Sequence, residues 1–294
     1  MSDQPTVSQS KFRHAREEAR DAKRAISTPQ TESKSYTLAF QDTEFLLRDD
    51  LRPVRFQLEL LKPELLLDEA RIASTFVFYG SARIPEPAAA QAAIDAARTD
   101  SERKVAERLA AKACYYEEAR KLARIAAQFP VNAEGCRNFV VCSGGGPSIM
   151  EAANRGAADV GAKTIGMNIV LPHEQAPNPY VTPDLSFQFH YFALRKMHFT
   201  LRARALAIFP GGFGTFDEFF ELLTLIQTGK MKRIPILLYG KEFWTRVVNF
   251  EALAEEGVIA HRDLELINWV ETAEEGWAVV EQFYEGQDAP CREE

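Results

Sequence analysis

The stretch "AIFPGGFGTFDEFFE", Ala207 to Glu221, joins three patterns within fifteen residues. An apolar run stops at Pro210, three glycines and Thr215 follow, and an acidic, aromatic segment comes next. The run "ALAIF" (205–209) predicts a buried strand, and "FDEFFELLTLIQTG" (216–229) predicts an amphipathic helix. Because glycine permits tight turns, the stretch as a whole predicts a strand, a sharp turn and a helix in direct succession.

The same alternation of strand and helix extends from residue 74 to the C-terminal region. Strands are predicted at 74–80, 163–170, 185–192 and 234–240, and a strand ending in a glycine turn is predicted at 138–146. Helices are predicted at 101–129, 147–162, 193–204, 242–257 and 272–285. Since this alternation is typical of βαβ units, we expect an α/β fold with a Rossmann-like, doubly wound parallel sheet and helices on both faces.

The segment before residue 74 has a different composition. Residues 1–36 are polar with mixed charge, which predicts a flexible or loosely docked arm. Residues 37–73 carry leucine and phenylalanine at helical spacing, interrupted by Pro53 and Pro63, which predicts a helical extension. We therefore expect three parts: the arm, the extension and one Rossmann-like domain at 74–294.

Composition narrows the class of protein. The chain has 294 residues and a net charge of −7, which argues against nucleic acid as a partner because phosphate backbones attract basic surfaces. No apolar run approaches the length of a membrane span, and the N-terminus lacks the apolar core of a signal peptide. Four cysteines without paired spacing fit reduced thiols. A cytoplasmic protein without a membrane partner is expected.

Glycines follow three of the predicted strands. They are Gly80; Gly144, Gly145 and Gly146; and Gly211, Gly212 and Gly214. Parallel strands bring their carboxyl ends to one edge of the sheet, and a glycine turn before a helix offers free N–H groups to a phosphate there. Neither "GGGPSI" nor "GFGTFD" has the third glycine of a dinucleotide motif, and the chain has no P-loop motif for nucleoside triphosphates. The glycines thus predict a phosphate site of another kind.

Two further features allow two interpretations each. Thr215 and Glu218 have the spacing of a capping box, in which each side chain bonds the other's backbone N–H, and Glu218 is equally a candidate working carboxylate. Arg195 and Lys196, on a predicted helix, are either a solvated basic pair or anchors for a phosphate. A carboxylate and basic groups beside glycine turns suit a sugar phosphate.

These residues resemble a known family. "GGGPSIMEAANRGA", the Arg-Lys pair and "PGGFGTFDE" are similar to the LOG (Lonely Guy) family of cytokinin riboside 5′-monophosphate phosphoribohydrolases, long mislabelled lysine decarboxylases. The likeness covers roughly residues 74–285, and the N-terminal segment is similar to that of longer bacterial members. The family pattern P-G-G-x-G-T-x-x-E is complete from Pro210 to Glu218.

The resemblance implies an enzyme that hydrolyses the N-glycosidic bond of a nucleoside 5′-monophosphate to free base and ribose 5-phosphate. It implies that residues 74–294 are a nucleotide-binding catalytic domain and that Arg195 and Glu218 are catalytic. The phosphate and substrate would be bound by Gly80, Ser81, Arg83, Gly144, Gly145, Gly146, Lys196, Gly211, Gly212, Gly214 and Thr215. Phe199 stands where family members often have methionine, which affects the shape of the base pocket.

The implied chemistry is the stabilisation of a ribosyl cation. A carboxylate at Glu218 would stabilise the positive charge at C1′ and orient or deprotonate water, while the proton donor to the base stays open between Asp217, Glu221 and water. No metal or organic cofactor is expected, and the family implies a homodimer or higher oligomer. A general nucleoside monophosphate nucleosidase for salvage and a non-catalytic nucleotide-binding protein are the alternatives. A pyridoxal phosphate decarboxylase is not supported, because it needs a Schiff-base lysine in a defined cofactor setting.

Overall fold

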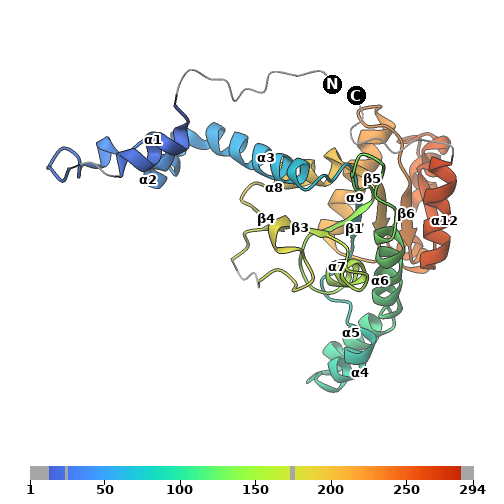
Figure 1. The fold of residues 1–294 in the computed structure, drawn as a ribbon. Helices are drawn as coiled ribbons and strands as arrows, with labels where there is room; N and C mark the ends of the chain where they lie inside the picture. The colour runs from blue at the N-terminus through green and yellow to red at the C-terminus, as the bar shows by residue number, and fades with distance from the viewer. Residues whose placement is uncertain (1–12, 24–25, 173–175, 286–294) are drawn as a thin grey trace. The chain divides into compact units, whose positions relative to one another are not determined.

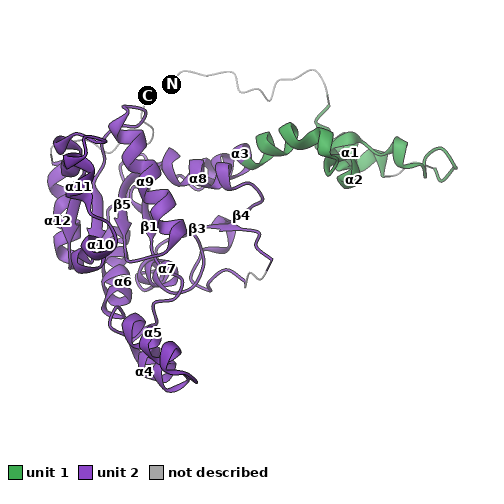
Figure 2. Cartoon of the chain, turned by 180° about the vertical axis from the view of Figure 1, so that it is seen from behind, with its two compact units in different colours: residues 1–59 green, residues 60–294 purple. Residues whose placement is uncertain are grey.

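The computed structural model describes residues 13–23, 26–172 and 176–285. The chain forms two compact units, residues 1–59 and 60–294 (Figure 2). This boundary lies within a helix, and the expected division at residues 36 and 73 stays a prediction. Residues 1–12 and 24–25 of the expected arm lie outside the described residues.

Helices occur both in the predicted arm (1–36) and in the predicted extension (37–73). The N-terminal segment holds α1 (Ala15–Ala22), α2 (Thr43–Leu46) and the beginning of α3 (Arg52–Glu69), which continues into the second unit. Short 3₁₀ helices precede α3 at Lys34–Tyr36, Ala39–Gln41 and Asp49–Leu51. None of the residues of α1 and α2 is buried, so these helices contribute little apolar packing of their own.

The second unit is built on a parallel sheet (Figure 1). Its described strands are β1 (Thr75–Tyr79), β2 (Val140–Ser143), β3 (Thr164–Ile169), β4 (Ser186–Phe189), β5 (Ala203–Ile208), β6 (Ile236–Tyr239) and β7 (Ile267–Val270). They pair in the order β4-β3-β2-β1-β5-β6-β7, and every neighbouring pair is parallel. The chain therefore winds outward from β1 in both directions, which confirms the predicted doubly wound, Rossmann-like sheet.

Helices connect the strands and cover the sheet. They are α4 (Pro87–Asp95), α5 (Asp100–Ala110), α6 (Cys114–Ala127), α7 (Ile149–Ala158), α8 (Phe192–Leu201), α9 (Phe213–Gln227), α10 (Lys241–Val247), α11 (Phe250–Glu255) and α12 (Ala273–Tyr284). Two further 3₁₀ helices lie at Pro183–Leu185 and His261–Leu266. All five residues of β1 are buried, as the continuous apolar run predicted for a strand covered on both faces.

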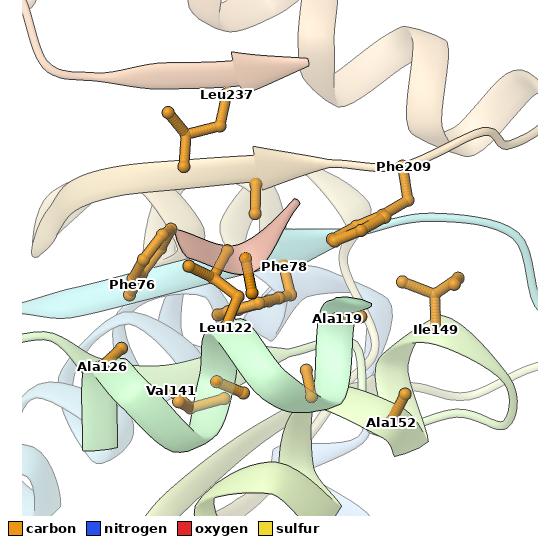
Figure 3. Close-up of a cluster of buried hydrophobic side chains, with 14 of the residues drawn as sticks. Phe76, Phe78, Ala119, Leu122, Ala126, Val141, Ile149, Ala152, Phe209 and Leu237 are labelled. Carbon is orange, nitrogen blue, oxygen red and sulfur yellow. The ribbon is translucent and has the colours of Figure 1, made fainter. Parts of the chain in front are cut away.

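Each face of β1 packs against a different set of helices. On one face, Phe76 and Phe78 lie near Leu122 of α6, in a buried cluster that also includes Ile149 of α7 (Figure 3). On the other face, the ring of Tyr79 meets Phe199 of α8 edge to face at 5.1 Å. Because alternate residues of a strand point to opposite faces, one apolar strand anchors both helix layers.

Two segments that were each predicted to form one helix form two helices instead. The predicted helix at 101–129 is divided into α5 and α6 by a tight turn, in which Ala113 N–H bonds the Ala110 carbonyl at 2.9 Å. The predicted helix at 242–257 is divided into α10 and α11, because Val248 is extended and the Asn249 side chain caps α11. Neither break carries a proline or glycine, so helical periodicity alone did not reveal it.

Other boundaries also shift. Helix α7 begins after Ser148, so Pro147 lies before the helix and not at its first position as predicted. The predicted helix at 193–204 ends at Leu201, since Ala203 already pairs in β5. Helix α4 and strand β7 were not predicted at all.

Two further observations concern the oxidation state of the cysteines and the length of the helices. Cys114 and Cys142 are free thiols, whereas Cys136 is disulfide-bonded, so the expectation of reduced thiols is wrong for Cys136. Cys291 lies outside the described residues. Within the described ranges, every helix is too short or too polar to cross a bilayer.

Candidate active site

A cavity of about 760 Å³ opens at the carboxyl ends of β1 and β5. These two strands are neighbours at the centre of the sheet, where the winding direction reverses. The loops that follow them are joined, since Ser81 N–H donates to the Pro210 carbonyl at 3.0 Å. Open α/β sheets bind ligands at such a switch point, so the topology places a ligand cavity where the glycines cluster.

Most of the predicted site residues line this cavity. They are Gly80, Ser81, Arg83, Gly144, Arg195, Gly211, Gly212, Gly214, Thr215 and Glu218. Gly145, Gly146 and Lys196 are not part of its lining. The structure thus brings together residues from the loops after β1, β2 and β5 and from α8 and α9.

The start of α9 differs from the predicted capping box. Gly212 is the N-cap and no side chain bonds the first turn, so Thr215 is the third helical residue and not the cap. Thr215 is buried, and a Cβ on Gly211 would overlap its hydroxyl. Gly211 therefore leaves room for the Thr215 side chain, and the helix begins three residues earlier than the pattern suggested, at Phe213 and not at residue 216. An uncapped N-terminus of a fifteen-residue helix offers N–H groups and a positive dipole end to an anion.

Glu218 faces the cavity from the second turn of α9. Its Oε2 lies 3.8 Å from the position of a Cβ on Gly214, so the carboxyl group lies beside the glycine segment and makes no capping box with Thr215. Burial raises the pKa of Glu218 to about 7, while Arg195 lowers it, Asp217 raises it and Lys196 lowers it. A carboxyl group that titrates near neutral pH is suited to exchange protons under physiological conditions.

Arg195 reaches the same cavity from α8. Its Nε donates to the Met167 carbonyl at 2.8 Å, and its guanidinium lies over the Phe199 ring at 5.2 Å. A Cβ on Gly144 would stand 2.7 Å from Arg195 Nη2, so the glycine at the end of β2 leaves room for the guanidinium. The cation is held from three sides and acts electrostatically on Glu218.

The other two glycines of the β2 turn shape the turn rather than the cavity. Gly145 has a φ of +73°, and its N–H donates to Ser143 Oγ at 3.1 Å. The Gly146 carbonyl accepts a bond from Asn178 Nδ2 at 3.0 Å. A Cβ on Gly145 would overlap the Asn168 amide, so the segment folds only with glycine at that position.

Lys196 lies next to Arg195 in sequence but has other partners. Its Nζ is 2.9 Å from Asp217 Oδ1 and 3.1 Å from Glu221 Oε2. The two basic residues therefore lie in different surroundings: Arg195 lines the cavity, and Lys196 belongs to an ion cluster between α8 and α9.

Sequence reasoning missed the apolar wall of the cavity. Met150 of α7, Phe213 at the start of α9, and Phe243 and Val247 of α10 all line it, beside Phe199, which the resemblance had already assigned to the base pocket. Phe213 is 96% exposed, which is unusual for a phenylalanine and marks the rim. The spacing of Phe243 and Val247 by four residues is the one sequence signal for a shared helix face, but nothing in it pointed to this cavity.

The charged groups at the cavity are mainly basic. Among the described residues, no group of three or more histidine, cysteine, aspartate or glutamate side chains is arranged to hold a metal ion. Arg195, Arg83 and the helix start instead give the cavity a cationic side suited to a phosphate.

Comparisons with known proteins point to one family. Residues 150–280 match the family model described as "Possible lysine decarboxylase". The Arabidopsis thaliana protein "Cytokinin riboside 5'-monophosphate phosphoribohydrolase LOG3" is 27% identical over 161 residues, which cover 53% of this chain and 71% of that protein. The Escherichia coli (strain K12) "Pyrimidine/purine nucleotide 5'-monophosphate nucleosidase" is 33% identical over 127 residues, covering 37% of this chain and 26% of that protein. The chain thus spans about a quarter of the length of the Escherichia coli relative.

Among solved structures, one is titled the X-ray structure of TM1055, a structural genomics target. It aligns with 71% of this chain and 99% of its own, with 20% identity and a TM-score of 0.44.

Proposed function

We propose that this chain, whose residues 150–280 match the family model described as "Possible lysine decarboxylase" and which is similar to a LOG protein, hydrolyses the N-glycosidic bond of nucleoside 5′-monophosphates. One observation carries the proposal: Arg195 and Glu218, from two different helices, converge on one cavity beside the uncapped start of α9. The names of the two sequence relatives support the same reaction class, a nucleosidase or phosphoribohydrolase acting on nucleotides.

The phosphate group would bind at the helix start. The N-terminal end of α9 and the exposed Gly212 and Gly214 leave backbone N–H groups accessible at the cavity. Binding energy from the non-reacting phosphate would then position C1′ near Glu218. The 5′-phosphate would then lie at the glycines, and the base would lie toward the apolar wall of Phe199, Phe213 and Phe243.

The chemical step would be carried by Glu218. As the C1′–N bond breaks, its electron pair goes to the base and positive charge develops on C1′ and the ring oxygen. An ionised Glu218 stabilises that charge and accepts a proton from the attacking water, whose oxygen bonds to C1′. The departing base takes up one proton from water or from a neighbouring acid, and Glu218 gives up the proton that it accepted, so that one water molecule is consumed for each bond broken. Arg195 favours the ionised form of Glu218, because it lowers the pKa that burial raises.

The family description names a decarboxylase, but the site does not suit one. A pyridoxal phosphate enzyme needs a lysine free to form a Schiff base. Lys196, the lysine adjacent to Arg195, is held by two carboxylates and does not line the cavity. The hydrolase proposal therefore fits these residues better than the description does.

The finer points of the function are also proposals. The apolar wall supports a purine nucleotide as substrate, with either plain AMP, as in salvage, or an isopentenyl derivative, as in cytokinin activation. We propose that the chain forms a homodimer, which the exposed apolar side chains of Phe192, Met197 and Leu201 on α8 support. We also propose that it acts in the cytoplasm. Light scattering on the purified chain gives the number of subunits, and a monomer at all concentrations would refute the dimer.

The test is direct measurement of base release. Purified protein is incubated with AMP, GMP, CMP and isopentenyladenine riboside 5′-monophosphate, and free base is separated by chromatography. We expect release from at least one purine nucleotide and a loss of about 10²- to 10⁴-fold in Glu218→Gln. The absence of released base from all four at high enzyme concentration would refute the enzyme and favour a nucleotide-binding protein. Competition between AMP and its isopentenyl derivative ranks the two substrates.

A further inference from the structure

Lys196 forms a bridge between α8 and α9. Its Nζ contacts Asp217 Oδ1 at 2.9 Å and Glu221 Oε2 at 3.1 Å. The lysine side chain is only 20% exposed, whereas those of Asp217 and Glu221 are 59% and 36% exposed. One partly buried cation thus serves two carboxylates at the edge of the candidate active site.

The two carboxylates flank Glu218 along α9. Asp217 and Glu221 are four residues apart, so they are neighbours on one helix face, where like charges destabilise a helix. Both add negative charge beside Glu218, and negative charge disfavours the ionised form of a nearby carboxyl group. Lys196 places a positive charge between them and offsets this effect.

We infer that Lys196 is a positioning residue that neutralises the carboxylates on either side of Glu218 and holds α9 against α8, so that Glu218 ionises at the cavity. This inference rests on the proposed function of the site. It replaces the expectation that Lys196 binds the substrate phosphate, since an ammonium with two carboxylate partners has little capacity left for a third anion.

The charged groups around Glu218 come from several elements. Arg195 and Lys196 of α8 lower the pKa of Glu218, and Asp217 of α9 raises it. Glu221 of α9 and Glu218 itself act on Tyr79 of β1, whose pKa burial raises well above its ordinary value. Arg83, from the loop after β1, also lines the cavity. In this set Lys196 is the cation that contacts Asp217 and Glu221, so its removal leaves two negative charges uncompensated.

The experiment compares pH profiles of base release for three variants. In Lys196→Met, the acid limb of kcat should move to higher pH by about half a unit to one unit, since the flanking carboxylates are partly exposed and screened. Lys196→Arg keeps the charge and should keep the wild-type limb. Lys121→Met removes another ion-paired lysine, the partner of Glu118 on α6, and should leave the profile unchanged.

A second substitution tests the electrostatic cause. Asp217→Asn in the Lys196→Met background removes one uncompensated charge and should return the acid limb toward its wild-type position. A limb that stays in place in Lys196→Met would overturn the inference. So would an increase in KM for the nucleotide but not for the corresponding nucleoside, because that result would make Lys196 a phosphate ligand.

A third measurement separates this inference from the proposed function. The Glu218 carboxyl carbon can be titrated by NMR in ¹³C-glutamate-labelled protein and assigned with Glu218→Gln, without any substrate. An upward shift of the Glu218 midpoint in Lys196→Met supports the inference even if no nucleotide is cleaved. An unshifted midpoint overturns it even if the enzyme is active.

Discussion

Arg195 lies against Gly144, so that a Cβ on the glycine would stand 2.7 Å from Arg195 Nη2. The two residues are far apart in sequence and come from different elements, the end of β2 and helix α8. Their contact explains why the β2 turn needs a glycine at its first position. The space that a side chain would take is occupied by the guanidinium that reaches the cavity.

The first prediction is that Gly144→Ala displaces Arg195 and lowers the rate of base release at least tenfold. The added methyl meets both Nη2 of Arg195 and Sδ of Met150, and the guanidinium is already fixed by the Met167 carbonyl. Steady-state kinetics measure the effect. Gly146→Ala is the control from the same turn, because its Cβ closely approaches only the flexible end of Met150. Similar losses in both variants would contradict a role for the Arg195 contact.

The second prediction distinguishes two neighbouring glycines at the start of α9. Gly212→Ala meets no atom within 4 Å, so the fold should be kept. Its methyl group would take up space that the proposed phosphate occupies at the start of α9. We therefore expect KM for the 5′-monophosphate to rise about tenfold, equivalent to about 1.4 kcal/mol.

Gly211→Ala is the structural counterpart, because its Cβ overlaps the Thr215 hydroxyl. Overpacking of this kind costs about 1–3 kcal/mol, so the melting temperature should fall by several degrees. Thermal unfolding and KM are measured for both variants. An unchanged KM in a well-folded Gly212→Ala protein would argue against phosphate binding at the start of α9.

The third prediction concerns the stability of Glu218→Gln as a function of pH. The folded-state pKa of Glu218 is raised from 4.5 to about 7, so the folded protein binds more protons than the unfolded chain between these values. Ionisation of Glu218 therefore destabilises the wild-type fold progressively as pH rises from 4.5 to 7. The shift corresponds to at most about 3 kcal/mol, less after solvent screening.

Glu218→Gln should accordingly gain stability relative to wild type as pH rises through this window and hold a constant advantage above it. Urea denaturation at a series of pH values gives the difference. A stability difference that does not change between pH 4.5 and 7 would place the Glu218 carboxyl in an ordinary, solvated setting.

The fourth prediction concerns an ion cluster that joins Arg202 and His198 to carboxylates of α3. Arg202 Nη2 lies 2.8 Å from Glu64 Oε2 and 2.9 Å from Asp68 Oδ1, and His198 lies beside Glu64 at 3.5 Å. His198 and Arg202 lower the pKa of Glu64 to about 2 against the opposing effect of burial. This stabilisation is present above pH 4.5 and is lost as pH falls toward 2.

Glu64→Gln should therefore lower the free energy of unfolding at neutral pH, by at most about 3 kcal/mol and less because the side chain is 30% exposed. The wild type and the variant should converge near pH 2. Glu69→Gln, at an exposed position of the same helix, is the control and should change stability by less than about 0.5 kcal/mol. Equal losses in the two variants would show that the cluster adds no specific stability.

Much of the fold followed from local patterns. Buried strands such as 74–80 and 234–240 were recognisable because both faces of a central parallel strand are covered, which leaves a continuous apolar run. Breaks such as the turn at 111–113 were not, because they contain no proline or glycine and are set by packing. Helix α6 buries Tyr116, Leu122 and Ala126 against the core, whereas Val105 of α5 is 52% exposed.

The sequence by itself determined the residue types near the carboxyl ends of the strands: the glycines of the turns, and Arg195 and Glu218 on the helices. Their spacing was enough to predict the turns and to identify the motif. Only the tertiary structure decided which of them meet. It brought Arg195 to the cavity and turned Lys196 to Asp217 and Glu221, although the two basic residues are adjacent. It also moved the helix start to Phe213, so that Thr215 no longer caps α9. The reason is physical: successive residues on a helix point in directions about 100° apart, and only the packing of α8 on α9 sets which direction leads to the cavity.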